Sequence, residues 1–509
     1  MASARTLLTR TFVLLLAAGL TAAAAQSQLT IMQTEAPRSM DPANHTATFT
    51  ASVLYPMYEG LVEMDEDQAI VPGLASQWTI SEDGTVYDFT LREGVTFHDG
   101  TPFDAEAALV SLHRLLDPDA GLAGAGRFQP VIREIEALDD MTLRFHLFDP
   151  YPAFLALMTA SQAGLVSPQA WEAGTLDREP VGTGPYRFVE WVSGERVVME
   201  ANPDYWGGEP EVERLVWTWS PEDAVMTMSL QAAEVDIAAP LPPVFAPTID
   251  ANPDIEVVEV TGSRVFWIAL TTTIEPLDDA RVRRALNHAT DKQGIVDSLL
   301  RGFGVPATSP LAPPNFGFDP TLEGLPFDPE GALSLLEEAG VSDGFTVNVA
   351  VQEADANVVE ALQAMWGAVG VQLNIQVMES GVWSEAAFAD PEGKARDDVH
   401  AAYASWATGT LDADGQLRAL YHTDSWAPAG ANLGFYSNER LDELLDIGAS
   451  TTDVAVRLEA YAEAQRILLE DAPHVWLHYP QALAALRTEV GGVWLSPAGQ
   501  LMIRQPTLN

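Results

Sequence analysis

The stretch that decides the fold runs from Leu74 to Pro118 and reads "LASQWTISEDGTVYDFTLREGVTFHDGTPFDAEAALVSLHRLLDP". Apolar and polar residues alternate in "TVYDFTLR" at 85–92, which predicts a strand with one buried face. Asp104 stands at the N-cap position of a following segment whose leucines recur at helical spacing. The stretch therefore predicts a strand, a turn and a helix in that order.

The turn between them contains "FHDG", where His98 stands beside Asp99. This pairing suits a metal site, a proton-transfer site or a hairpin. Two adjacent side chains cannot enclose a metal without ligands from elsewhere, and Asp-Gly is a common turn sequence. We therefore expect Asp99 and Gly100 to form the turn and His98 to make a local hydrogen bond that holds it.

The chain has 509 residues, with 73 acidic against 26 basic residues and a formal net charge of -47 at pH 7. This length predicts two or three domains. Nucleic acid is excluded as a partner, because phosphate backbones bind clusters of Lys and Arg. The acidic residues are spread along the whole chain, which is typical of a solvated surface.

Residues 1–25 have the pattern of a secretory signal peptide, with Arg5 and Arg10 before an apolar run and small residues at Ala23–Ala25. No other uncharged stretch reaches the roughly 20 residues that a membrane helix needs. The absence of cysteine excludes disulfides, thiolate zinc sites and a lipid attached to cysteine. These features predict an exported periplasmic protein without a lipid anchor.

Further along the chain, "PVGTGP" at 180–185 predicts a tight crossing segment between two subdomains. Valines at 347–351 predict a strand, helical spacing at 358–369 predicts a helix, and alternation at 371–377 predicts a second strand. This order favours a parallel pair of strands. "HVWLHY" at 474–479 predicts another strand. The fold class is therefore α/β, with two lobes.

Several common catalytic signatures are absent, since the sequence contains no His-Glu-x-x-His, no glycine loop of the P-loop type and no Ser-x-x-Lys. The nine histidines are scattered, and His474 and His478 are expected to be ordinary neighbours on one face of a strand. The sequence thus predicts no catalytic residues, no cofactor and no metal. A periplasmic hydrolase with a metal held by scattered His and Asp residues stays open as an alternative.

The Leu74–Pro118 stretch resembles the signature region of the family 5 extracellular solute-binding proteins, the dipeptide, oligopeptide and nickel receptors of ABC importers. Four further segments are similar to family blocks in the same order: "PVGTGPYRF", "ANPDYWGGEPEVERLV", "DDARVRRALNHATDK" and "AQRILLEDAPHVWLH". The resemblance covers nearly the whole chain after the signal peptide. It implies a binding protein and not an enzyme.

The resemblance also implies the two-lobed periplasmic binding protein fold of type II, with an extra subdomain on the first lobe. By this analogy lobe I comprises 26–50, 183–262 and 480–509. The extra subdomain would be 51–182, and lobe II would be 263–479. "FHDG" would then belong to the scaffold of the extra subdomain.

The mechanism that the family implies is closure of two lobes about a hinge. A peptide or other small solute is held between the lobes, and the closed form is delivered to an ABC transporter permease in the inner membrane. Such receptors are expected to act as monomers. A receptor that signals the presence of its solute through the same cleft stays open as an alternative.

Peptide-binding relatives are expected to hold the α-amine of the ligand with an aspartate shortly after a cleft tryptophan. In "AYASWATGTLDADG" the tryptophan is Trp406, but Thr408 and Thr410 follow it and the first acid is Asp412. Dipeptide receptors also use an arginine upstream of the helix that bears Trp366, and "VAVQEADANVVEALQAMW" contains none. We therefore predict peptides or peptide-like solutes, with glutathione, a metal chelate or an oligosaccharide as alternatives.

The candidate ligand-binding residues come from both lobes. From lobe II they are Trp406, Thr408, Thr410 and Asp412, with Trp383 as a stacking wall. From lobe I they are the polar residues after the "MDPA" turn, namely Asn44, His45 and Thr46.

Overall fold

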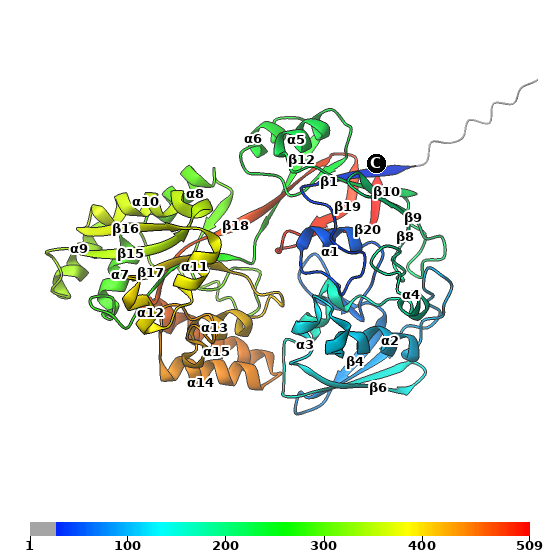
Figure 1. Ribbon diagram of the computed structural model, residues 1–509, viewed down its shortest axis with the longest axis horizontal. Helices are drawn as coiled ribbons and strands as arrows, with labels where there is room; N and C mark the ends of the chain where they lie inside the picture. Colours follow the sequence, from blue (N-terminus) through cyan, green and yellow to red (C-terminus); the bar gives the residue numbers. More distant parts are fainter. Residues whose placement is uncertain (1–26) are drawn as a thin grey trace, which may run out of the picture.

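The computed structural model describes residues 27–509, so the predicted signal peptide at 1–25 lies outside the described residues. The described chain forms two lobes of mixed α/β structure that stand side by side in Figure 1. Within this range no helix combines the length and apolar character needed to cross a bilayer. The predicted fold class is confirmed.

One sheet of twelve strands runs through both lobes, and ten of its strands follow the order β16-β15-β17-β13-β18-β11-β1-β10-β9-β8. The strands of the first lobe are β1 (Gln28–Gln33), β8 (Tyr186–Val192), β9 (Arg196–Ala201), β10 (Arg214–Trp219), β11 (Ile237–Ala238) and β12 (Ile255–Thr261). Those of the second lobe are β13 (Val265–Leu270), β14 (Gly304–Pro306), β15 (Phe345–Gln352), β16 (Val371–Met378) and β17 (Ala401–Trp406).

Strand β18 (His474–Arg487) belongs to both lobes and is longer than "HVWLHY" predicts. Its first half pairs with β13, and its second half pairs with β12. Pro480 lies near the change of partner, where the missing N–H of proline is tolerated. Figure 1 shows β18 crossing from the left lobe to the top of the right lobe. The predicted lobe limits at 262/263 and 479/480 stay a proposal, which this change of partner supports.

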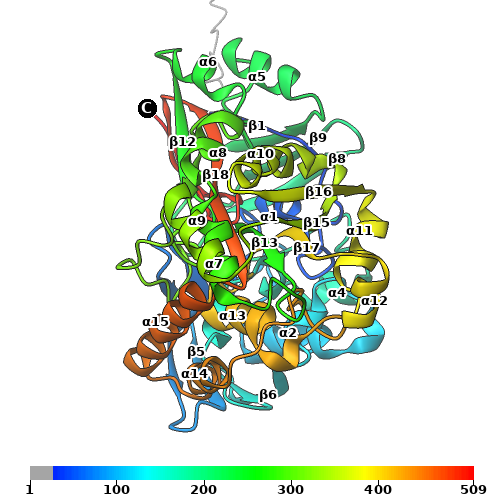
Figure 2. The ribbon, with the colours of Figure 1, turned by 90° about the vertical axis from the view of Figure 1, so that its left-hand side faces the viewer.

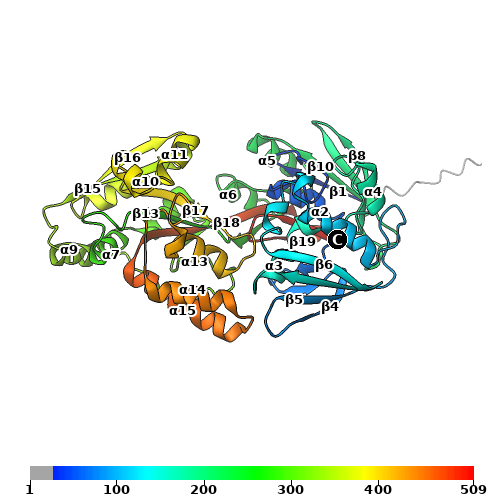
Figure 3. The same cartoon turned by 60° about the horizontal axis from the view of Figure 1, so that its bottom comes forward.

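Two layers of helices cover the sheet of the second lobe. Trp267 and Ala269 of β13 pack against helices on one face, and Ile268 and Leu270 pack against helices on the other. The first layer, visible below the sheet in Figure 3, is α13 (Ala413–Tyr421), α14 (Glu439–Ser450) and α15 (Val454–Asp471). The second layer includes α7 (Ala280–His288), α9 (Pro329–Glu338) and α10 (Ala356–Gly367).

The strand, helix, strand order predicted at 347–377 is confirmed, since β15, α10 and β16 follow one another and the two strands are parallel. Strand β17 is also parallel to β15. Figure 2 shows β15, β16 and β17 side by side, with α11 (Ser380–Ala387) near them. The carboxyl ends of these three strands therefore lie at one edge of the sheet.

The Leu74–Pro118 stretch lies in a separate four-stranded sheet of order β4-β5-β7-β6. The elements concerned are β4 (Ala75–Ile80), β5 (Val86–Leu91), α2 (Ala105–Leu116), β6 (Ile132–Asp139) and β7 (Thr142–Leu147). Asp104 caps α2 by accepting a hydrogen bond from the backbone of Ala107, as predicted. Tyr87, Phe89 and Phe145 pack into a core of their own. This core supports the predicted extra subdomain.

The "FHDG" segment forms the predicted turn, because Gly100 has φ +85° and its N–H bonds the carbonyl of Phe97. The expected local role of His98 is wrong. Its Nε2 donates to the carbonyl of Gly184, 2.9 Å away, and its Nδ1 faces the N–H of Gly182 at 3.4 Å. The turn therefore holds the distant "PVGTGP" segment, a partnership that local sequence does not reveal.

Gly182 must be glycine for a steric reason. A Cβ atom there would lie 2.1 Å from the carbonyl oxygen of Met57 and 2.6 Å from the ring of Tyr58. Burial of the His98 ring beside this segment lowers its pKa to about 4, so the ring is neutral at pH 7.

We predict that His98→Gln removes one source of acid sensitivity. The unfolded chain takes up a proton on His98 near pH 6.5, whereas the folded protein does so only near pH 4. The contribution of the neutral His98 ring to the free energy of unfolding is complete above pH 6.5. It decreases by about 1.4 kcal/mol per pH unit as the pH falls toward 4. The stability gap between wild type and variant should therefore narrow over this range. Urea unfolding at several pH values measures it, and a gap independent of pH contradicts the prediction.

Candidate functional site

A cavity of about 260 Å³, which we call the tryptophan cavity, lies at the carboxyl ends of β15 and β17 and is lined as well by α11, which follows β16. Gln352 ends β15, Trp383 follows β16 on α11, and Trp406 ends β17. The crevice beyond the carboxyl ends of parallel strands is a common ligand site in α/β proteins. The lining also includes Trp267, Asp355, Phe388, Tyr403, Ala404, Ser405, Leu420, Ala431 and Leu433.

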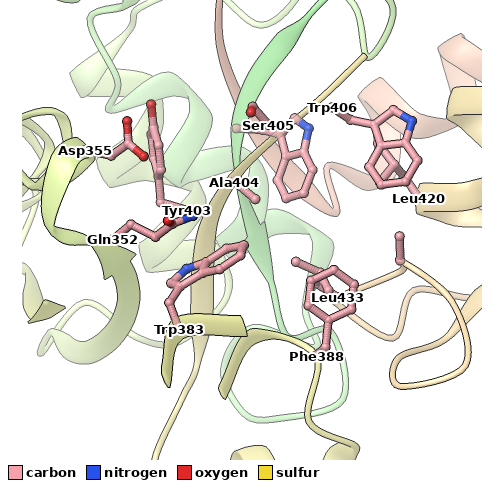
Figure 4. Close-up of a pocket in the computed structure, with 12 residues that line it drawn as sticks. Gln352, Asp355, Trp383, Phe388, Tyr403, Ala404, Ser405, Trp406, Leu420 and Leu433 are labelled. Carbon is pink, nitrogen blue, oxygen red and sulfur yellow. The ribbon is translucent and has the colours of Figure 1, made fainter. Parts of the chain in front are cut away.

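Three indole rings give this cavity apolar, aromatic surface. Figure 4 shows Trp383 and Trp406 on different sides of it, with Phe388 below them in this view. The Nε1–H groups of Trp267, Trp383 and Trp406 have no acceptor in the described residues. These nitrogens are themselves buried, so the rings offer a ligand their apolar faces, on which its apolar parts would pack.

Asp355 supplies the acidic group of the tryptophan cavity. Its carboxylate lies beside the ring of Tyr403 in Figure 4. No ion pair among residues 27–509 includes Asp355, and burial raises its pKa. A partly buried carboxylate without a cationic partner suits a ligand amine, because the amine would offset the cost of its desolvation.

A second cavity of about 420 Å³ lies where the chain crosses between the lobes, and we call it the hinge cavity. Gly262 and Pro480 contribute the crossing segments, and their backbones are joined by a hydrogen bond of 2.8 Å. The lining also includes Thr46, Thr48, Arg127, Ser263, Arg264, Ala407, Thr408, Gly409, Gln481, Ala482, Pro497, Ala498 and Gly499. Since Trp406 lines one cavity and Ala407 the other, the two are neighbours along the end of β17.

Four of the predicted ligand residues line these cavities. Trp383 and Trp406 meet in the tryptophan cavity. Thr46 and Thr408 meet in the hinge cavity, although they are far apart in the sequence. That these residues contact a ligand stays a prediction.

Thr410 and Asp412 lie outside both cavities. Thr410 bonds Thr408 through their hydroxyl groups at 2.9 Å. The two carboxylate oxygens of Asp412 are each 2.8 Å from Nη2 of Arg457, and both side chains are buried. Asp412 also caps α13. Its carboxylate is therefore held within lobe II by an arginine.

Asn44 and His45 also lie outside both cavities. Asn44 donates to Asp177, with 3.1 Å between Nδ2 and Oδ1. His45 is buried, and burial lowers its pKa to about 4. Its carbonyl accepts from Gln162, whose Oε1 accepts in turn from Arg127. His45 is thus linked through Gln162 to Arg127, which lines the hinge cavity.

Sequence reasoning missed three charged residues, namely Asp355, Arg127 and Arg264. Asp355 could have been found, because it comes shortly after a strand of the predicted parallel pair. Arg127 and Arg264 carry no local signal. They reach one cavity only because the extra subdomain and the crossing segment meet there.

No catalytic constellation lies at these cavities. In the part of the chain that the structure describes, no group of three or more His, Asp and Glu is placed to hold a metal ion. The run from Gly340 to Gly344 has the Gly-x-Ser-x-Gly pattern, but its serine is exposed and lies between a helix and the following strand. A nucleophile elbow needs the reverse order, from strand to helix.

Comparison with known proteins decides the family. The profile described as bacterial extracellular solute-binding proteins, family 5, middle, matches residues 69–428. The chain belongs to this family. It is thereby a solute-binding protein of the type that serves ABC importers. The resemblance predicted from the Leu74–Pro118 stretch is confirmed.

Relatives and solved structures agree with this assignment. The glutathione-binding protein GsiB of Pectobacterium atrosepticum is 32% identical over 465 residues, which cover 90% of each chain. The structure of HbpA2 from Haemophilus parasuis has a TM-score of 0.88 and 27% identity, covering 95% of this chain and 100% of that one. The periplasmic binding protein DppA from Helicobacter pylori, in complex with the peptide STSA, has a TM-score of 0.73 and 26% identity, covering 95% and 98%.

We predict that Asp412→Asn lowers the free energy of unfolding by about 3–5 kcal/mol, because it leaves the buried Arg457 without a counter-ion. Affinity for ligand should stay within a few-fold of wild type in the folded fraction. Chemical unfolding and calorimetric titration measure the two quantities. Asp424→Asn, at an exposed position, is the matched control. A stable variant that has lost ligand affinity would show instead that Asp412 holds the ligand.

Proposed function

We propose that this protein is the periplasmic receptor of an ABC importer for peptides or peptide-like solutes. It captures the solute between its two lobes and delivers it, chemically unchanged, to a permease of the inner membrane. The observation that carries the proposal is the pair of neighbouring cavities. Lobe II contributes a carboxylate and aromatic rings to them, the extra subdomain contributes Arg127, and the crossing segment contributes Arg264. Such a layout complements a molecule with an amine and carboxylates at different ends.

The amine end of the solute is assigned to Asp355. The family pattern of an aspartate just after the cleft tryptophan is absent here, and Asp412 is held by Arg457. Asp355 approaches the same cavity from the end of β15 and has the free carboxylate that the role requires. Apolar parts of the solute would pack on the aromatic rings of the same cavity.

Glutathione is the first solute to test. The GsiB relatives are named as glutathione-binding, and identities of 29–32% over 90% of the chain make the same class of ligand reasonable here. Glutathione is a peptide with one amine and two carboxylates. One carboxylate shares a carbon with the amine, and the glycine carboxylate lies at the opposite end, where it would suit the arginines of the hinge cavity. Transport needs only moderate affinity, and micromolar binding corresponds to about -8 kcal/mol.

Closure of the two lobes is expected because the groups that would contact the solute lie on both of them. A solute that contacts Asp355 on lobe II and the first lobe at the same time binds the closed form more strongly than the open form. Ligands shift a conformational equilibrium only through such a difference in affinity. Because β18 and the Gly262 segment tie the lobes together on one side, closure is expected as a rotation about these segments.

We predict that glutathione or a short peptide stabilises and compacts the protein. At a ligand concentration 100 times Kd the stabilisation should be about 2.7 kcal/mol. Thermal unfolding and small-angle X-ray scattering measure the two effects. The panel includes glutathione, di- to pentapeptides, a nickel chelate and an oligosaccharide. If none of them changes either signal, the proposal fails.

Within this test, Asp355→Asn identifies the end of the solute that lobe II binds. The variant should lower affinity about tenfold or more for a ligand with a free amine. It should leave the affinity for the N-acetylated form of the same ligand nearly unchanged. Asp343→Asn, at an exposed position on the same lobe, is the matched control.

A further inference from the structure

Two arginines of the hinge cavity approach it from different parts of the fold. Arg127 ends the short helix η2 (Ala125–Arg127) of the extra subdomain. Arg264 precedes β13, directly after the chain has crossed between the lobes. Both line the hinge cavity.

The protein gives neither guanidinium a carboxylate partner. Nη1 of Arg127 donates to Oε1 of Gln162 at 3.1 Å, and Nη1 of Arg264 donates to Oγ of Ser405 at 2.9 Å. No ion pair within residues 27–509 includes either arginine. Most of their N–H donors are therefore free for a ligand.

The surroundings of these arginines make a missing anion costly. Both side chains are open to solvent, yet enough protein surrounds them that desolvation lowers the pKa of each. No acidic side chain counters this effect at either residue; only Tyr151 acts on Arg127 in the opposite sense. An anion placed between them would replace the lost hydration.

Elsewhere in the described chain, buried guanidinium groups have acceptors. Arg457 pairs with Asp412, Arg114 with Asp41, and Arg504 with Glu63. Arg283 donates to backbone carbonyls instead. Arg127 and Arg264 are exposed and have no carboxylate partner among residues 27–509, and the lining of the hinge cavity contains no acidic residue although the chain has 73.

We propose that Arg127 and Arg264 form an anion subsite that binds the carboxylates of an acidic solute. The proposal rests on the receptor function proposed above and narrows its ligands to peptides or peptide-like molecules with two carboxylates. The planar fork of each guanidinium suits a carboxylate through two parallel hydrogen bonds. With Asp355 in the neighbouring cavity, the two sites match a solute with an amine at one end and a carboxylate at the other.

Gly409 links this subsite to closure. A Cβ atom at Gly409 would lie 2.9 Å from Nη2 of Arg127, so the guanidinium of the extra subdomain lies against the backbone of the second lobe. Arg264 meets Ser405 of the same lobe. An anion held by both arginines therefore lies where the extra subdomain, the crossing segment and the end of β17 meet, and it bridges the lobes.

The test compares Arg127→Gln and Arg264→Gln with wild type, using glutathione and the peptide Ala-Glu-Ala as probes. Each variant removes a charge but keeps an amide, and each should weaken binding about 10- to 100-fold. Arg133→Gln is the matched control, because Arg133 is exposed on β6 of the same subdomain and lines neither cavity. Calorimetric titration measures affinity, and circular dichroism checks that each variant is folded.

The same subsite is tested on wild type by changing the probe. Glutathione diethyl ester and the amide of Ala-Gln-Ala lack the carboxylates but keep the amine, and they should bind at least about tenfold more weakly than the acidic probes. Equal binding of acidic and blocked probes, or unchanged affinity in both variants, overturns the anion subsite and leaves the receptor function standing. Failure of all four probes and of neutral peptides to bind overturns both.

Discussion

The structure depends on strand β18, whose hydrogen bonds are shared between the two lobes. Its first half is bonded to β13 and its second half to β12, so neither lobe has a complete sheet without it. The continuous chain of β18 and its hydrogen bonds to β12 and β13 fix the distance between the lobes along this strand but leave rotation of the lobes about it possible. The hinge cavity lies beside the segments that cross between the lobes. The tryptophan cavity is next to it, at the edge of the part of the sheet that belongs to the second lobe. The position of the binding region follows from this strand.

Charge is used differently inside the lobes and between them. Within a lobe, buried charged groups have partners in the protein: Asp412 neutralises Arg457, and Arg283 donates to backbone carbonyls. At the cavities, Asp355, Arg127 and Arg264 have no oppositely charged partner among residues 27–509, and each lies where a solute could supply one. Unpaired charges of opposite sign in neighbouring cavities give orientation as well as affinity, because a reversed solute would meet groups of its own sign.

The "FHDG" segment illustrates the limits of local reasoning. Asp99 and Gly100 form the turn that their residue types predict, and Asp104 caps the helix that follows. His98, however, bonds Gly184 across 86 positions of sequence. Turn and cap preferences act within a few residues and are visible in the sequence, whereas the partner of a buried imidazole depends on which distant segment packs beside it.

The sequence by itself determined the family, the α/β class and the parallel β15–β16 pair, because periodic patterns and ordered blocks record them directly. It also led to Trp383 and Trp406, which line the tryptophan cavity; that they contact a ligand stays a prediction. Only the tertiary structure decided that Asp412 is neutralised by Arg457, and that Asp355, Arg127 and Arg264 face cavities without partners. Whether a charged side chain is free or paired depends on distances between segments far apart in the chain. Those distances are set by packing around β18 and by no local pattern.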